Sequence, residues 1–175
     1  MIYVFADPAS QTSRPVPDVL RQVLTDFEAN QPVHQFQWGA WSELQPLALP
    51  LRLEVFVHEQ QVPLEMEQDE WDPEALHTVV TNGMGMPIAT GRLVQQAEGV
   101  SRIGRMAVTR VLRGGGLGQQ VLQALIDVAV RRGDREVVLH AQRHATNFYA
   151  QAGFIPHGEP FDEAGIPHIE MRRAL

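Results

Sequence analysis

The chain has 175 residues, of which 44% are hydrophobic and 20% charged, so it is expected to fold as one globular domain and not as a disordered or fibrous protein. Its formal net charge of −7 at pH 7 argues against a nucleic-acid partner, because such binding relies on clustered positive charge. The sequence contains neither cysteine nor lysine, which excludes disulfides, thiolate metal sites, cysteine nucleophiles and lysine Schiff bases.

The N-terminus carries no sign of export. Residues 1–7 lack the basic region and the long apolar stretch of a secretory signal. No apolar run approaches the roughly 20 residues needed to cross a bilayer. We therefore expect a soluble cytoplasmic protein with no membrane contact.

Residues 1–34 are predicted to form an N-terminal extension. Apolar residues recur at helical spacing in residues 16–29, and Asn30-Gln31-Pro32 would end such a helix. We expect this helix to pack on the main domain or on a second copy of the chain, so a homodimer is possible.

The main domain, residues 35–175, is predicted to begin with a short strand at residues 35–38. A helix capped by Ser42 should follow and run through Phe56. Residues 65–74 contain six carboxylates and are bounded by prolines, which predicts a loop. This acidic segment is either a solvated loop or a surface that steers a cationic amine.

Three strands are expected next, at residues 77–81, 88–94 and 102–108. Asn82-Gly83 indicates a hairpin between the first two, although the following residues make its loop longer than two. An antiparallel meander is the simplest arrangement of these three strands.

A glycine-rich segment, residues 113–118, opens the second half and leads into an amphipathic helix at residues 119–132. Gly133 is well placed to end that helix. The predicted fold is a mixed α/β sheet of about six or seven strands flanked by helices, parallel where this helix crosses over. The remaining elements are a strand at residues 136–141, a helix at 145–151 and strands at 154–157 and 168–172.

Three consecutive glycines before a helix indicate an anion site, because the backbone can approach a ligand closely and the first amides of the helix are unpaired. A phosphate or pyrophosphate is the expected occupant. The Walker pattern requires a lysine, which the chain lacks, and the Rossmann pattern requires a glycine where Val121 stands. A glycine-rich turn without a ligand is the remaining alternative.

The motif Arg113-x-x-Gly116-x-Gly118 resembles the signature of the GNAT superfamily of N-acetyltransferases. Residues 105–108 resemble the splayed strand that precedes the signature, and residues 147–154 resemble the Asn-x-x-Tyr/Phe-x-x-x-Gly-Phe segment that follows it. Two motifs in this order are more specific than either alone.

A narrower resemblance is to the ElaA-like branch of that superfamily. It is carried by Arg52-x-x-Val55-Phe56-x-x-Glu59-Gln60, by Asp69-x-x-Asp72 and by the ending Gly165-Ile166-Pro167-His168-Ile169-Glu170-Met171. Together these motifs cover roughly residues 35–175 and leave the role of the extension open.

The resemblance implies a GNAT fold and direct transfer of an acetyl group from acetyl-CoA to a primary amine of a small molecule or peptide. A backbone amide of the splayed strand would stabilise the oxyanion. The cofactor-binding residues that the resemblance implies are Met106, Ala107, Val108, Arg113, Gly114, Gly115, Gly116, Leu117, Gly118, Asn147 and Tyr149.

The resemblance also implies that Tyr149 protonates the departing thiolate, although its ring could serve only as a wall of the cofactor site. Glu59 is the first candidate for the general base. The alternatives are a water chain or one of three histidines, His77, His144 and His168. The histidines of the sequence do not occur at the spacings typical of metal ligands, so no metal site is expected. An acyl-CoA-binding regulatory module without turnover is the competing hypothesis for the whole chain.

Overall fold

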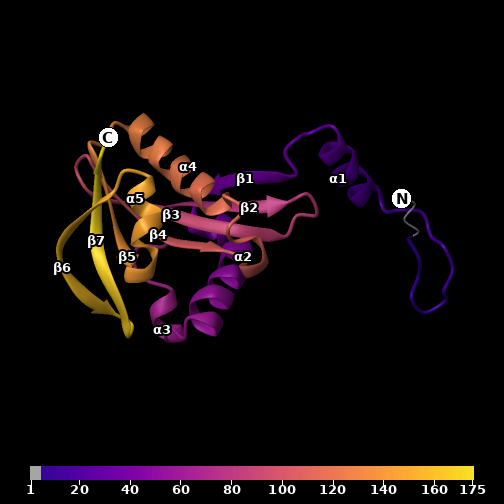
Figure 1. Cartoon of the computed structure of the whole chain (residues 1–175), viewed down its shortest axis with the longest axis horizontal. Helices are drawn as coiled ribbons and strands as arrows, with labels where there is room; N and C mark the ends of the chain where they lie inside the picture. The colour runs from indigo at the N-terminus through magenta and orange to yellow at the C-terminus, as the bar shows by residue number, and fades with distance from the viewer. Residues whose placement is uncertain (1–4) are drawn as a thin grey trace.

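The computed structural model describes residues 5–175 and contains a seven-stranded sheet in the order β1-β2-β3-β4-β5-β7-β6 (Figure 1). All neighbouring strands pair antiparallel except β4 and β5, which are parallel. The strands are β1 (His34–Gly39), β2 (Leu76–Asn82), β3 (Pro87–Ala97), β4 (Val100–Val108), β5 (Glu136–Gln142), β6 (Ile155–Glu163) and β7 (Ile166–Ala174). The mixed sheet and its strand number confirm the expected fold.

Helices cover both faces of the sheet, with α4 on one face and α2 on the other (Figure 1). Gly91 lets α4 approach β3 closely, since a Cβ there would lie 2.9 Å from Cδ1 of Leu125. On the other face, Leu44 and Ala48 pack on Val79. The α-helices are α1 (Asp18–Glu28), α2 (Trp41–Arg52), α3 (Leu64–Glu67), α4 (Leu117–Arg132) and α5 (Thr146–Gln151).

Strands β4 and β5 pair along only part of their length and then separate. Their last paired residues are Ile103 and Leu139. Just beyond, Arg105 has a φ of 50° and the register of β4 against β3 shifts, so β4 is bulged and turns away from β5. Along Gly104–Val108 no strand in the described part of the chain pairs with the edge that faces β5. The splayed strand expected from the sequence is therefore present.

Helix α2 continues into a π-helix at Leu53–Glu59, so the helical segment ends three residues later than predicted. It begins at Trp41 with Ala40 as N-cap, and Glu43 accepts the amide hydrogen of Ala40 at 3.1 Å. The predicted capping role of Ser42 is wrong because the chain is already helical there.

The acidic segment, residues 65–74, differs most from expectation. It begins with α3, and the carboxylates of Glu67 and Asp72 are buried. Asp72 accepts hydrogen bonds from Arg52 at 2.8 Å and from Arg92 at 2.6 Å, and Glu67 pairs with Arg52. A solvated loop is thus the wrong description of these two residues, because their charges are compensated by buried arginines.

The described part of the N-terminal extension, from residue 5 onward, lies to one side of the sheet (Figure 1). Its helix α1 has no buried residue, and Val19 and Phe27 are 56% and 71% exposed. Its contact with the domain includes Val23, which lies against Gly83 in the β2–β3 turn. The boundary between the extension and the domain near residue 34 stays a prediction.

Candidate functional site

Two pockets meet where β4 and β5 separate. The larger, of about 670 Å³, lies between the segment containing α3 and the strands β5, β6 and β7. The smaller, of about 400 Å³, lies between β4 and the glycine segment before α4. Four residues line both pockets: Gln60, Met106, His144 and Tyr149.

The glycine segment forms the mouth of the smaller pocket. Gly114 and Gly116 have φ values of 82° and 83°, a conformation that residues with a Cβ rarely adopt. The first backbone bond of α4 runs from the amide of Gln120 to the carbonyl of Gly116 at 3.1 Å. Among the described residues no acceptor takes the preceding amides of Leu117 and Gly118. These free amides at the positive end of a 16-residue helix fit a phosphate group.

Arg113 sits beside this turn and is held by two groups. Its Nε donates to the carbonyl of Val108 at 2.9 Å, and its Nη1 lies 2.8 Å from Oε2 of Glu59. The structure thus brings two of the predicted site residues together. Arg113 lines the smaller pocket, whereas Glu59 belongs to the lining of neither pocket.

Tyr149, on α5, is half-buried where the two pockets meet. Its ring packs edge-on against Phe148 and Phe154, with centroids 4.9 and 6.2 Å away. Burial raises the pKa of Tyr149 to about 12, so its hydroxyl keeps the proton at neutral pH.

Most of the other predicted cofactor residues lie around the smaller pocket. Met106, Ala107, Val108, Gly114, Gly116 and Gly118 line it. The side chain of Leu117 is buried in the core against the sheet, so only its backbone is available at the turn. Gly115 and Asn147 lie outside the pocket lining, and Asn147 is exposed on α5.

The three histidines proposed as alternative bases lie in different places. His77 is buried outside both pockets, where Nε2 lies 2.8 Å from the carbonyl of Asp72 and burial lowers its pKa. His144 is exposed and lines both pockets, and His168 lies on the wall of the larger one, its Nδ1 2.7 Å from the carbonyl of Ile166.

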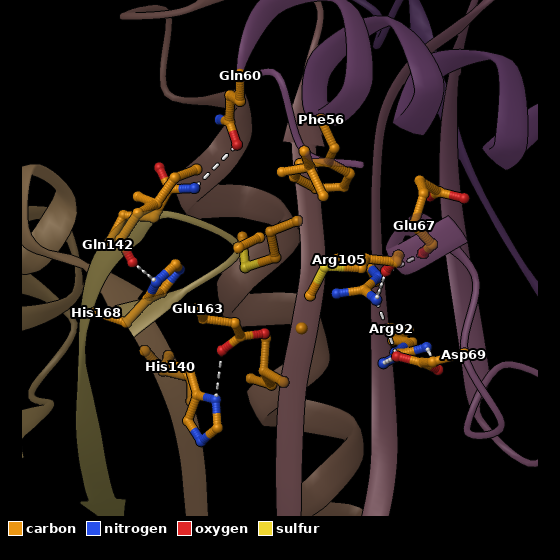
Figure 2. Close-up of a pocket in the computed structure, with 18 of the residues that line it drawn as sticks. Phe56, Gln60, Glu67, Asp69, Arg92, Arg105, His140, Gln142, Glu163 and His168 are labelled. Carbon is orange, nitrogen blue, oxygen red and sulfur yellow. Dashed lines mark hydrogen bonds and ion pairs between the residues drawn. The ribbon is translucent and has the colours of Figure 1, made fainter. Parts of the chain in front are cut away.

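Figure 2 shows that charged groups stand on opposite walls of the larger pocket. On one wall, Arg105 donates to Asp69 at 2.9 Å and to the carbonyl of Glu67 at 3.0 Å. On the other, Nδ1 of His140 lies 3.0 Å from Oε2 of Glu163.

Several of these wall residues belong to none of the sequence motifs. His140 and Glu163 are 23 positions apart, and only the pairing of β5 with β7 and of β7 with β6 brings them together. Gln60 and Gln142 are 82 positions apart and share a hydrogen bond of 2.9 Å between the helical segment and β5. The alternation of residues along β5 could have placed His140 and Gln142 on one face, but not their partners.

No group of three or more metal-ligating side chains occurs among residues 5–175. None of the described helices has the length and apolar character of a membrane span.

Comparisons with known proteins bear on the whole domain. A family model described as "Acetyltransferase (GNAT) domain" matches residues 28–175. The chain is 36% identical over 127 residues to the uncharacterized N-acetyltransferase YjcF of Bacillus subtilis (strain 168), a match over 72% of this chain and 89% of that protein. It is 35% identical over 131 residues to the protein ElaA of Escherichia coli (strain K12), covering 73% of this chain and 85% of ElaA.

Solved structures show the same architecture. The crystal structure of Escherichia coli ElaA matches with a TM-score of 0.72 and 33% identity, over 80% of this chain and 99% of that chain. An acyl-CoA N-acyltransferase from Pseudomonas aeruginosa matches with a TM-score of 0.73 and 34% identity, over 81% and 99%. These matches confirm both the fold and the ElaA-like resemblance of the motifs.

Proposed function

The chain belongs to the GNAT acetyltransferase family, with an ElaA-like sequence, and from that premise we propose that it moves the acetyl group of acetyl-CoA to a primary amine of a small molecule or peptide. An acyl-CoA is the co-substrate of this fold. The proposal covers the acetyl group as the acyl group transferred, the amine acceptor and the roles of individual residues.

The observation that carries the proposal is the position of Tyr149 on the lining of both pockets. One pocket has the free amides that suit a pyrophosphate, and the other is open and lined by charged groups. A thioester held in the first and an amine held in the second would meet beside the tyrosine hydroxyl.

The smaller pocket supplies the groups that would hold coenzyme A. The backbone of Gly114–Gly118 would bind the pyrophosphate, with the guanidinium of Arg113 beside it. The free edge of Met106–Val108 would pair with the pantetheine arm as an added strand does, and one of its amides would stabilise the oxyanion. Asn147 would reach the same arm from α5.

Tyr149 would act as the general acid. Its raised pKa means that the phenol is fully protonated when the thiolate departs. A thiolate leaving into the same apolar surroundings is also more basic than it is in water, which favours taking the phenolic proton.

Glu59 as the general base stays a prediction, and its ion pair with Arg113 gives a way to test it. If Glu59 only holds Arg113, Glu59→Gln changes the affinity for acetyl-CoA and leaves kcat nearly unchanged. If Glu59 is the base, kcat falls and the affinity for acetyl-CoA stays as it was.

The rim of the larger pocket supports a cationic acceptor. Glu65 and Glu70 are exposed on its lining, and neither has an ion-pair partner among the described residues. Two free carboxylates at the entrance would attract an amine that is protonated at neutral pH.

The test is to incubate the protein with acetyl-CoA and a panel of polyamines, amino sugars, amino acids and peptides, and to follow thiol release. The proposal expects release with at least one class of amine. Because the chain has no lysine, any acetyl-lysine detected belongs to the peptide acceptor and not to the protein. Binding of acetyl-CoA by calorimetry without release for any acceptor would instead indicate a regulatory module that holds acyl-CoA.

A further inference from the structure

A histidine–carboxylate pair lies on the wall of the larger pocket. His140 comes from β5 and Glu163 from the end of β6, and Nδ1 of the histidine lies 3.0 Å from Oε2 of the glutamate (Figure 2). Both residues line the same pocket as Tyr149, with side chains 32% and 41% exposed. The pair is therefore accessible to a molecule in that pocket.

His140 lies at the point where β4 and β5 separate. The parallel pairing of β4 with β5 ends at Leu139, so His140 is the first residue beyond the last pair. Because side chains alternate along a strand, Leu139 points into the core under α4 and His140 points to the other face. The imidazole thus lies where the gap between the two strands opens into the larger pocket.

The hydrogen bond to Glu163 orients the imidazole. It lowers the pKa of Glu163, which keeps this residue a carboxylate and makes Nδ1 of His140 the donor. Nε2 then carries the lone pair, and no group among residues 5–175 bonds to it. The ring of Phe161 packs edge-on against the imidazole at 4.9 Å, which restricts its rotation.

We propose that His140 is the proton acceptor for the amine, with Glu163 as the residue that positions it. This rests on the proposed transferase function. An acceptor that arrives as an ammonium ion first loses one proton to solvent. The neutral amine nitrogen then bonds to the thioester carbonyl carbon, and its remaining excess proton passes to Nε2 of His140. The carbon–sulfur bond then breaks, and the thiolate takes the proton of Tyr149. The proton on His140 returns to Tyr149 through water in the open pocket, so both residues end as they began.

Other titratable groups face this pair and bear on its pH dependence. Arg105 comes from the β4 side, and its positive charge contributes to the lowered pKa of Glu163. His144 lies on the same pocket lining. Glu170 is the register partner of His140 on β7, but its carboxylate is engaged by Arg172 at 2.7 Å.

Two substitutions test the proposal in the full chain. His140→Gln keeps a hydrogen-bonding side chain but cannot take the proton, so kcat should fall about 100-fold with little change in KM for acetyl-CoA. Glu163→Gln should lower kcat about tenfold, and Glu163→Asp should restore part of the loss.

The matched control is His157→Gln, which removes an exposed histidine of β6 outside the pocket lining and should leave kcat unchanged. NMR of the imidazole nitrogens gives a readout independent of turnover: at neutral pH the proton of His140 should be on Nδ1. A proton on Nε2, or wild-type kcat in His140→Gln, would overturn the role of His140 and leave the transferase intact. Absence of turnover in a wild-type chain that binds acetyl-CoA would refute the transferase, and the proton transfer with it.

Discussion

At the scale of single residues, the hydroxyl of Tyr149 is the group with the most direct consequence for turnover. Tyr149→Phe removes the proton that the departing thiolate needs and keeps the ring that packs on Phe148 and Phe154. We expect kcat to fall about 100-fold, while acetyl-CoA affinity measured by calorimetry changes little. Wild-type turnover in this variant would remove Tyr149 from the mechanism.

The raised pKa of Tyr149 also predicts the behaviour of the wild-type protein in base. Since that pKa is about 12, the phenol does not lose its proton between pH 7 and about pH 10. Any decline of kcat in this range therefore belongs to another group, and it should persist in Tyr149→Phe.

Asp72 determines part of the stability in acid. Burial alone would raise the pKa of Asp72, but hydrogen bonds and positive charge from Arg52 and Arg92 outweigh it and lower the pKa from 3.8 to about 2. A lowered folded-state pKa adds stability above the unfolded value, and this is lost as pH falls from about 4 to about 2. The free energy of unfolding should decline over that window by about 2 kcal/mol from this group.

Urea unfolding at a series of pH values measures this effect. Asp72→Asn should show a shallower decline in acid and a lower stability at neutral pH, because it leaves two buried arginines undercompensated. An equally steep decline in the variant would assign the acid sensitivity to other carboxylates.

At the scale of the elements, the turn before α4 needs glycine for its left-handed backbone, and the same turn is proposed to bind the pyrophosphate of acetyl-CoA. Gly116 is the N-cap of α4 with a φ of 83°, so Gly116→Ala should lower the free energy of unfolding by about 1–2 kcal/mol. Displacement of the adjacent amides should also weaken acetyl-CoA binding.

Gly115→Ala is the matched variant for stability. Gly115 lies outside the left-handed region, and a Cβ there would meet its nearest neighbour, the carbonyl oxygen of Leu112, at an ordinary 3.5 Å. A smaller loss of stability is expected by urea unfolding. Equal losses in the two variants would contradict the conformational explanation.

Long periodic elements could be predicted from the sequence because their own residues determine them. The helix α4 follows from apolar residues at helical spacing and from Gly133, whose φ of 84° ends it. The glycine segment and Tyr149 could be found because they lie within short motifs. The π-helix at Leu53–Glu59, after α2, was not predicted, because the apolar spacing of the segment indicates only a helix and not its hydrogen-bond pattern.

Strand β6 explains why the opposite wall of the larger pocket was not foreseen. The strand predicted from the sequence covers residues 154–157 only, but β6 continues to Glu163. A register shift between His157 and Phe161, with Gly158 at a φ of 72°, absorbs the break. Only with this bulge in place does Glu163 reach His140.

At the scale of the whole molecule, the helix α1 of the N-terminal extension stays exposed and is not buried against the domain. Apolar residues on α1 are exposed, and the packing of this helix on a second copy of the chain stays one of the two arrangements expected from the sequence. The family match begins at residue 28, near the end of α1, so most of the extension lies outside the matched region.

The two pockets share lining residues but lie on different sides of the point where β4 and β5 separate. Acetyl-CoA and the amine can therefore be bound at the same time. Initial rates measured against amine at several fixed acetyl-CoA concentrations should therefore give double-reciprocal lines that intersect. Parallel lines would indicate two half-reactions linked by a covalent acyl-enzyme intermediate. The chain contains no cysteine that could carry the acyl group as a thioester. A desulfo analogue of coenzyme A should likewise compete with acetyl-CoA and not with the amine.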